Sequence, residues 1–341
     1  MKKMLIFLLV LLVALTIGFI GAGCKGVTTE TTAEAETTAV AEESKKEVEI
    51  PLILMGRFTE FLIAMEDGAK SKAGELNVKF TSVDGQSSNE VQYNSVIDLI
   101  GKGVSALLIN PIDSEGIVAA IEAANKAKIP VVTLDAPAAG GVIAAHVGFD
   151  NYKAGAMNAE YLVSIIGESG TILEITGPVG AYHAKLRHQG FADVMAKYPD
   201  IKIIEKSADW QADKAYSITM DIVGTTEISG IYVQNDEMPI GVVAALKELG
   251  KLIPLGEKGH IPLVAIDGTP SALDRIQEGI QDITVGQDPV TVGVIAMDLA
   301  YKASQGEEHE SEFSVSPILL DKSNIDDPDL WGNAYAKKIS K

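Results

Sequence analysis

Short apolar runs alternate with longer amphipathic segments along most of the chain. Runs rich in Val, Ile and Leu predict buried strands, and apolar residues three or four apart predict the helices between them. Within residues 90–103, for example, one helical face is formed by Val91, Val96, Ile97 and Ile100, and Gly101 and Gly103 supply a stop. The pattern therefore predicts a regular strand–helix alternation.

The predicted strands form two successive sets. They lie at 49–54, 78–83, 106–109, 131–134 and 143–147, and then at 171–176, 201–207, 229–234, 262–266 and 283–287. Alternation of this kind indicates parallel sheets covered by helices on both faces. The sequence thus predicts the α/β class, with two doubly wound parallel-sheet domains.

The amino-terminal segment has the arrangement of an export signal. Lys2 and Lys3 precede an apolar run from Met4 to Ile20, and small residues then lead to Cys24, the only cysteine. The segment IGAGC resembles the lipobox of bacterial lipoproteins, in which the chain is cut before a cysteine that becomes lipidated. We expect a signal peptide at 1–23 and lipidation of Cys24. The alternative is an uncleaved anchor, because the run is nearly long enough to span a bilayer.

A Thr/Ala/Glu-rich stretch follows, with too little apolar content to fold. Residues 24–46 are therefore interpreted as a flexible tether that holds the folded part off a membrane. Either account of the amino terminus places the rest of the chain on the outer face of the cytoplasmic membrane, in a periplasm or at a cell surface. With Cys24 lipidated, no thiol is left for a disulfide or a metal, and we expect no metal and no cofactor.

Charge excludes one class of partner. The 341 residues carry a formal net charge of −19, from 28 basic and 47 acidic residues. An acidic surface repels phosphate backbones, so we expect no nucleic-acid partner.

Polar side chains close five of the predicted strands. These residues are Asn110, Asp135, Asn235, Asp267 and Gln287. In open parallel sheets, ligands bind outside the carboxyl ends of the strands. Helix capping is the alternative account, since Asp and Asn favour the N-cap position. Capping explains Thr269 before Pro270 and Asp288 before Pro289, and we expect Asp236 to cap the helix after it.

Amides and carboxylates together suit a neutral polyhydroxy ligand, because each hydroxyl both donates and accepts hydrogen bonds. Charge-assisted bonds make Asp135 and Asp267 candidate anchors, with Arg187 as a donor. The alternative for Arg187 is an exposed basic residue. Sugars also present an apolar face that aromatic rings cover. Trp210 and Phe61 are the candidates, although Phe61 could equally pack in the core.

Five motifs make the pattern specific: LINPIDSEG, IPVVTLDAP, YVQNDEMPIG, VAIDGTPSAL and VGQDPVTVG. In this order they resemble the ribose-binding protein and its periplasmic sugar-binding relatives over residues 48–320. The resemblance implies two α/β lobes, joined by three crossovers, that close on a sugar and deliver it to the permease of an ABC importer. It implies a monomer without catalytic residues, and some relatives signal to chemoreceptors.

The resemblance also assigns boundaries and contacts. It implies one lobe of 47–149 plus 288–316 and another of 150–287 plus 317–333. Hinges would lie at Phe149–Asp150, Gln287–Asp288 and Ser316–Pro317. The implied ligand-binding residues are Phe61, Asn110, Asp135, Arg187, Trp210, Asn235, Asp267 and Gln287.

Four positions depart from the ribose pattern. Ala136 stands where the ribose protein has an arginine, Met55 and Thr59 replace a serine and an asparagine, and Leu62 replaces a phenylalanine. Loss of one buried donor of a charge-assisted bond would cost ribose about 1.5–3 kcal/mol. The ligand could therefore be a different pentose, a hexose or a sugar alcohol.

Two other function classes compete with a transport receptor. A glycosidase-like enzyme could use Asp135 and Asp267, because two carboxylates flanking a sugar suit that chemistry. His183 and His188, five residues apart, do not share a helical face as a zinc pair would. A sensor could pass the sugar signal to a chemoreceptor or a sensor kinase. We expect a binding protein rather than an enzyme.

Overall fold

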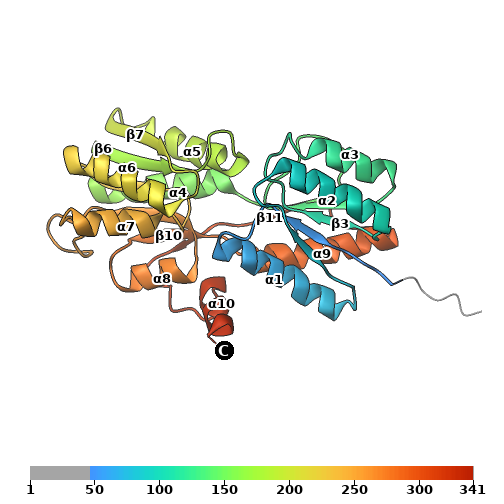
Figure 1. Ribbon diagram of the computed structural model, residues 1–341. Coiled ribbons are helices and arrows are strands. Elements are labelled where there is room, and N and C mark those ends of the chain that lie inside the picture. Colours follow the sequence, from blue (N-terminus) through green and yellow to red (C-terminus); the bar gives the residue numbers. More distant parts are fainter. Residues whose placement is uncertain (1–46, 341) are drawn as a thin grey trace, which may run out of the picture. The chain divides into compact units, whose positions relative to one another are not determined.

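The computed structural model describes residues 47–340, so the predicted signal peptide, Cys24 and the tether lie outside the described residues. Two six-stranded sheets, each covered by helices, make up the fold (Figure 1). This confirms the predicted α/β class. Among the helices of residues 47–340, none is both long and apolar enough to cross a membrane.

The first sheet has the order β11-β5-β4-β3-β1-β2, and all of its strand pairs are parallel. Its strands are β1 (Leu52–Leu54), β2 (Ser82–Asp84), β3 (Leu107–Ile109), β4 (Val131–Leu134), β5 (Ala145–Phe149) and β11 (Glu312–Val315). Its helices are α1 (Glu60–Glu75), α2 (Asn89–Lys102), α3 (Val118–Lys126) and α9 (Pro289–Gln305). Leu52 and Leu54 face the core shared with α1 and α9, whereas Ile53 faces the core under α2 and α3.

The second sheet has the order β12-β10-β9-β8-β6-β7, and only β12 runs antiparallel, against β10. Its strands are β6 (Ser169–Thr176), β7 (Asp200–Ser207), β8 (Gly230–Val233), β9 (Leu263–Asp267), β10 (Ile283–Gly286) and β12 (Ile318–Leu320). The helices of this part are α4 (Asn151–Ile166), α5 (Tyr182–Met195), α6 (Ala212–Thr225), α7 (Pro239–Glu248) and α8 (Pro270–Gln277). Separate apolar clusters fill its two faces, one under α4 and α5 and one under α6 and α7.

Strands β11 and β12 were not among the predicted runs. Each lies at the edge of its sheet, β11 beside β5 and β12 beside β10. Edge strands bury little, and both are short and largely exposed or half-buried. Strand β11 alternates polar and apolar residues, and the apolar β12 is only three residues long, so neither gives the longer apolar run of a central strand. With them, the chain passes between the sheets three times, after β5, after β10 and after β11.

The last helix, α10 (Trp331–Ile339), touches elements of both sheets. The Trp331 indole Nε1 donates to the Asp267 carbonyl oxygen at the end of β9, at 2.9 Å. Its ring packs edge-on against Phe61 of α1, with 6.5 Å between centroids, and Lys338 pairs with Asp67 of α1 at 2.9 Å. Helix α10 therefore joins α1 of the first sheet to β9 of the second.

A histidine fixes the loop between α7 and β9. His260 Nδ1 lies 2.7 Å from the Ile253 carbonyl oxygen, and Nε2 lies 2.9 Å from Asp282 Oδ2. Both partners are acceptors, so only the imidazolium can donate to both. Burial alone would lower the pKa of His260, but the Asp282 carboxylate and the Ile253 carbonyl outweigh it and raise the pKa.

We expect the contacts of His260 with Ile253 and Asp282 to weaken at alkaline pH. Because the pKa of His260 is raised in the folded state, its contribution to folding stability is full below the ordinary pKa of about 6.5. That contribution is lost as pH rises through the folded-state pKa. In thermal unfolding, His260→Gln should therefore lower Tm at pH 5.5 and lower it much less at pH 9. His309 provides the control because it is only half-buried and, within residues 47–340, contacts no carboxylate, and His309→Gln should leave Tm unchanged at both pH values. A decrease in Tm that is equal at both pH values in His260→Gln would contradict the role of a charged His260.

Candidate functional site

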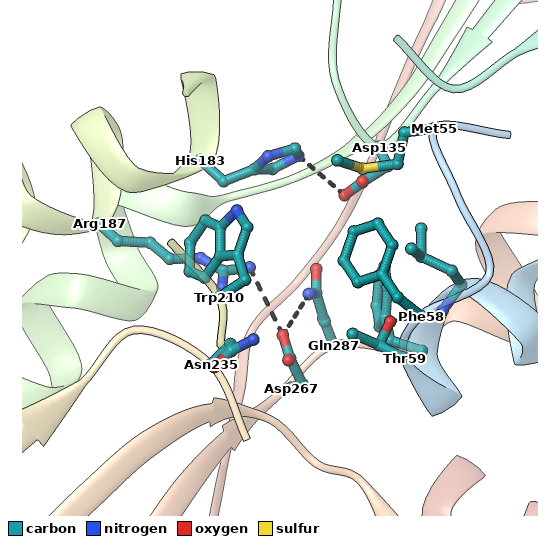
Figure 2. Close-up of a pocket in the computed structure, with 12 residues that line it drawn as sticks. Met55, Phe58, Thr59, Asp135, His183, Arg187, Trp210, Asn235, Asp267 and Gln287 are labelled. Atoms are coloured by element: carbon teal, nitrogen blue, oxygen red, sulfur yellow. Dashed lines mark hydrogen bonds and ion pairs between the residues drawn. The ribbon is translucent and has the colours of Figure 1, made fainter. Parts of the chain in front are cut away.

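One cavity of about 450 Å³, including its opening to solvent, lies where strand ends of both sheets meet (Figure 2). It is lined by Met55, Phe58, Thr59, Phe61, Leu62, Asp135, His183, Arg187, Trp210, Asn235, Asp267 and Gln287. Of the residues predicted to bind ligand, all except Asn110 line this cavity. Ligands bind outside the carboxyl ends of the strands in open parallel sheets, so the grouping of these residues at the strand ends is expected for a ligand site.

Asn110 stands behind the lining. It is fully buried, its Oδ1 accepts from the Met55 backbone N–H at 3.1 Å, and its Nδ2 donates to Asp135 Oδ2 at 3.1 Å. Its side chain therefore orients Asp135 and the first loop. A direct contact between Asn110 and a ligand stays a prediction.

Asp135 follows β4 and lies 3.0 Å, through Oδ1, from His183 Nε2. The contact is close enough for an ion pair, although its angle falls short of a hydrogen bond. Burial raises the pKa of Asp135, but the nearby charges of His183 and Arg187 and the bond from Asn110 outweigh burial and lower the pKa below its usual value. Asp135 is therefore an ionised acceptor at neutral pH.

Asp267, at the end of β9, has different surroundings. Its Oδ1 accepts from Gln287 Nε2 at 2.7 Å and lies 3.6 Å from Arg187 Nη2, and its Oδ2 accepts from the Asp236 backbone N–H at 3.3 Å. Burial raises the pKa of Asp267 to about 7, against the opposing charge of Arg187, and the negative Asp236 adds to the rise. The two carboxylates thus differ in protonation behaviour near neutral pH.

Arg187 of α5 is only 3% exposed, so the alternative of an exposed basic residue is wrong. Its Nε donates to Asn151 Oδ1 at 2.7 Å, and Nη1 donates to the Gln234 carbonyl oxygen. Helices α4 and α5 approach closely there, since a Cβ on Gly155 would lie 2.0 Å from the Arg187 carbonyl oxygen. The guanidinium is therefore held by the backbone and by α4 before any ligand arrives.

Aromatic rings flank the polar groups. Trp210 lies between β7 and α6, and its ring faces the Arg187 guanidinium at 5.8 Å from the ring centroid. Gly177 makes room for this ring, because a Cβ there would lie 2.1 Å from it. Phe61 is 7% exposed, so it lines the cavity and also packs in the core. The core-packing account is therefore confirmed, and a contact between Phe61 and a sugar stays a prediction.

Three site residues have left-handed backbone conformations that side chains rarely adopt. The φ angles are 67° for Asp135, 63° for Trp210 and 135° for Asp267. Non-glycine residues in such regions cost about 1–3 kcal/mol each and cluster at ligand sites. The surrounding fold holds these three side chains at the cavity against local preference.

The expected capping role of Asp236 is wrong. Asp236 is fully buried, and it accepts from the Gly268 N–H at 2.7 Å, the Thr269 N–H at 3.0 Å and Thr284 Oγ1 at 2.9 Å. It therefore ties the turn after β9, which carries Asp267. Helix α7 has Met238 as its N-cap residue and no side-chain cap bond. Asn235 Oδ1 accepts from the Met238 N–H at 3.1 Å, and Figure 2 shows its amide nitrogen turned into the cavity. Thr269 and Asp288 cap α8 and α9, as predicted.

Two lining residues were missed by the sequence reasoning. Phe58 precedes α1 and is 46% exposed, and no apolar periodicity includes it. His183 was weighed only as a zinc partner of His188, which instead contacts Glu174 at 2.9 Å. The available signal was its spacing from Arg187, because residues four apart share a helical face.

Two doubly wound α/β sheets whose strand ends share a cavity of carboxylates, amides, guanidinium and aromatic rings define a type I periplasmic solute-binding protein. Residues 50–308 match the family described as the periplasmic binding protein domain. The chain belongs to this family, among its sugar-binding members.

Curated relatives and solved structures agree with this membership. The ribose import binding protein of Bacillus subtilis is 30% identical over 82% of this chain and 88% of its own length. The xylitol-binding protein of Mycolicibacterium smegmatis is 26% identical over 79% of this chain and 76% of its own. A solute-binding protein of Actinobacillus succinogenes with bound D-allose has a TM-score of 0.76, at 29% identity, covering 82% of this chain and 99% of that one.

The relatives bind sugars or polyols of various kinds and serve ABC importers. Family members are solute receptors, and membership implies an exported protein. Within residues 47–340, no group of three or more His, Cys, Asp or Glu side chains could hold a metal ion.

Proposed function

We propose that this protein is a lipid-anchored receptor that binds a monosaccharide or a sugar alcohol between two lobes and delivers it to the permease of an ABC importer. The observation that carries the proposal is the lining of the cavity. Asp135 and Asp267 can accept from hydroxyls, while Arg187, Asn235 and Gln287 can donate.

The geometry suits a ring or chain with hydroxyls on two sides. Asp135 and His183 lie on one side of the cavity, and Asp267 and Gln287 lie on the other (Figure 2). Trp210 supplies a ring face for the apolar C–H surface of a sugar. A polyhydroxy ligand would thus bond to both carboxylates while it packs against the indole.

The two lobes would close on the ligand, because Asp135 and Asp267 belong to different lobes. We assign 47–149 plus 288–316 to one lobe, with Asp135, and 150–287 plus 317–333 to the other, with Asp267. Hinges at the three crossovers would let a ligand stabilise the closed state by contacting both lobes. Cys24 would carry the lipid that holds this monomer at the outer face of the membrane.

The ligand class can be tested by a thermal-shift screen across pentoses, hexoses and sugar alcohols. A ligand at 100 times its Kd adds about 2.7 kcal/mol of stability. For a protein of this size, that raises Tm by roughly 5 °C or more. Amino acids serve as the comparison panel and should leave Tm unchanged.

Two outcomes of the screen would contradict the proposal. In the first, no sugar or polyol shifts Tm while an amino acid does, which would reassign the ligand class. In the second, a bound sugar is recovered chemically altered after incubation, which would indicate an enzyme. We expect the ligand to be recovered unchanged.

A further inference from the structure

The contact between His183 and Asp135 joins elements of the two sheets along one side of the cavity. His183 lies in the first turn of α5, which packs with α4 against the second sheet, whereas Asp135 follows β4 of the first sheet. Their side chains are only 12% and 6% exposed, with 3.0 Å between Nε2 and Oδ1 (Figure 2). A close contact between an imidazole and a carboxylate therefore joins the two halves of the site directly.

Helix α5 places a basic side chain beside each carboxylate. His183 and Arg187 are four residues apart, so both project from one face of the helix. Arg187 lies 3.6 Å from Asp267, and His183 lies 3.0 Å from Asp135. In the first sheet, the residue after Asp135 is the buried Ala136, which carries no charge.

We propose that protonated His183 is a specificity-determining residue of the ligand site, which draws the two lobes together through Asp135 and bonds the hydroxyl that Asp135 accepts. The inference rests on the proposed sugar-binding function. Ligand affinity is then highest when His183 is charged, and it falls as the imidazole loses its proton.

Other titratable groups surround His183. On α5, the Tyr182 ring meets it edge-on at 5.6 Å, and Arg187 lies one turn further. From β5, His146 hydrogen-bonds Thr133 Oγ1 at 3.0 Å, and burial lowers the pKa of His146, which keeps it neutral at neutral pH. Glu312 of β11 and Asp150, before α4, add negative charge nearby.

The direction of the pH effect follows from these groups. Asp135 stays ionised because its pKa is lowered, so the proton on His183 decides whether the pair is ionic. Asp267, with a pKa of about 7, changes charge between pH 5.5 and pH 8.5, so the effect of His183 must be measured as a difference between variants.

The test uses the full chain and a sugar or polyol identified by the thermal-shift screen. Calorimetry at pH 5.5 and pH 8.5 compares wild type, His183→Gln and Lys185→Gln. Lys185 is exposed on the same helix and does not line the cavity, so its variant controls for loss of charge alone. His183→Gln should bind about tenfold more weakly than wild type at pH 5.5, since charge-assisted bonds are roughly twice as strong as neutral ones. At pH 8.5 the ratio should approach one, and Lys185→Gln should follow wild type at both pH values.

The inference is overturned if the ratio of wild-type to His183→Gln affinity is the same at both pH values, or if the two proteins bind equally well at pH 5.5. A second measurement needs no ligand: by small-angle scattering, wild type should have a smaller radius of gyration at pH 5.5 than at pH 8.5. His183→Gln should not show this difference, and a wild type that does not change contradicts the lobe-joining role. Failure of every sugar to bind wild type would instead overturn the proposed function.

Discussion

Asp267→Asn is expected to abolish sugar binding and yet to stabilise the ligand-free protein above pH 7. The carboxylate is buried, and it is shared among Gln287, Arg187 and the Asp236 backbone N–H. Asparagine keeps the shape but cannot accept as a charged group. Loss of a charge-assisted bond to a ligand hydroxyl, with Arg187 left unbalanced, should weaken binding by at least a hundredfold, about 3 kcal/mol.

The stability effect has a definite sign. The folded pKa of Asp267 is about 7, against an ordinary value of 3.8. Between these values the folded state holds a proton that the unfolded state releases, so stability falls as pH rises through this range. Asparagine removes that cost, and thermal unfolding should therefore show a higher Tm than wild type at pH 8 and little difference at pH 4.

The matched control is Asp274→Asn, on the exposed face of α8. It should change neither the affinity measured by calorimetry nor the pH profile of Tm. Wild-type affinity in Asp267→Asn would refute the role of this carboxylate. A Tm difference that does not depend on pH would refute the raised pKa.

Arg187→Gln is expected to lose both binding and stability. The guanidinium donates to Asn151 and to the Gln234 carbonyl oxygen, and it faces Asp267 and the Trp210 ring. Breaking a buried charged cluster by removing one partner costs about 3–5 kcal/mol. Glutamine cannot reach all of these acceptors at once, so Tm should fall by roughly 6 °C or more.

Affinity by calorimetry and Tm by scanning calorimetry should fall together in Arg187→Gln. Arg187→Lys should lose less affinity and less stability than Arg187→Gln. The lysine ammonium can face Asp267, but it cannot reproduce the several directed hydrogen bonds of a planar guanidinium. Lys185→Gln again serves as the control, because Lys185 is exposed, lies two residues before Arg187 and does not line the cavity. Full affinity in Arg187→Gln would show that the ligand does not use this donor.

Much of the site could be predicted because parallel strands bring their carboxyl ends to one edge. That rule alone gathers Asp135, Asn235, Asp267 and Gln287 without any knowledge of the helices. The rule for caps is less exact, because it depends on register to a single residue. Asp236 ties the turn after β9 and does not cap α7, because its partners, such as Gly268 and Thr284, are distant in sequence.

Contacts across the cavity could not be predicted from local pattern. His183 gains its role only when α5 is placed opposite Asp135. Strands β11 and β12 likewise form because β5 and β10 offer free edges, and at four and three residues both segments are too short to be recognised from pattern alone.

The placement of the indoles has a practical consequence. The chain has two tryptophans: Trp210 lines the cavity, and Trp331 of α10 lies between Phe61 and the Asp267 backbone. Both indoles therefore lie where the two halves of the site meet. The intrinsic fluorescence of the unlabelled protein comes mainly from this junction, so ligand occupancy should be readable optically without an attached dye.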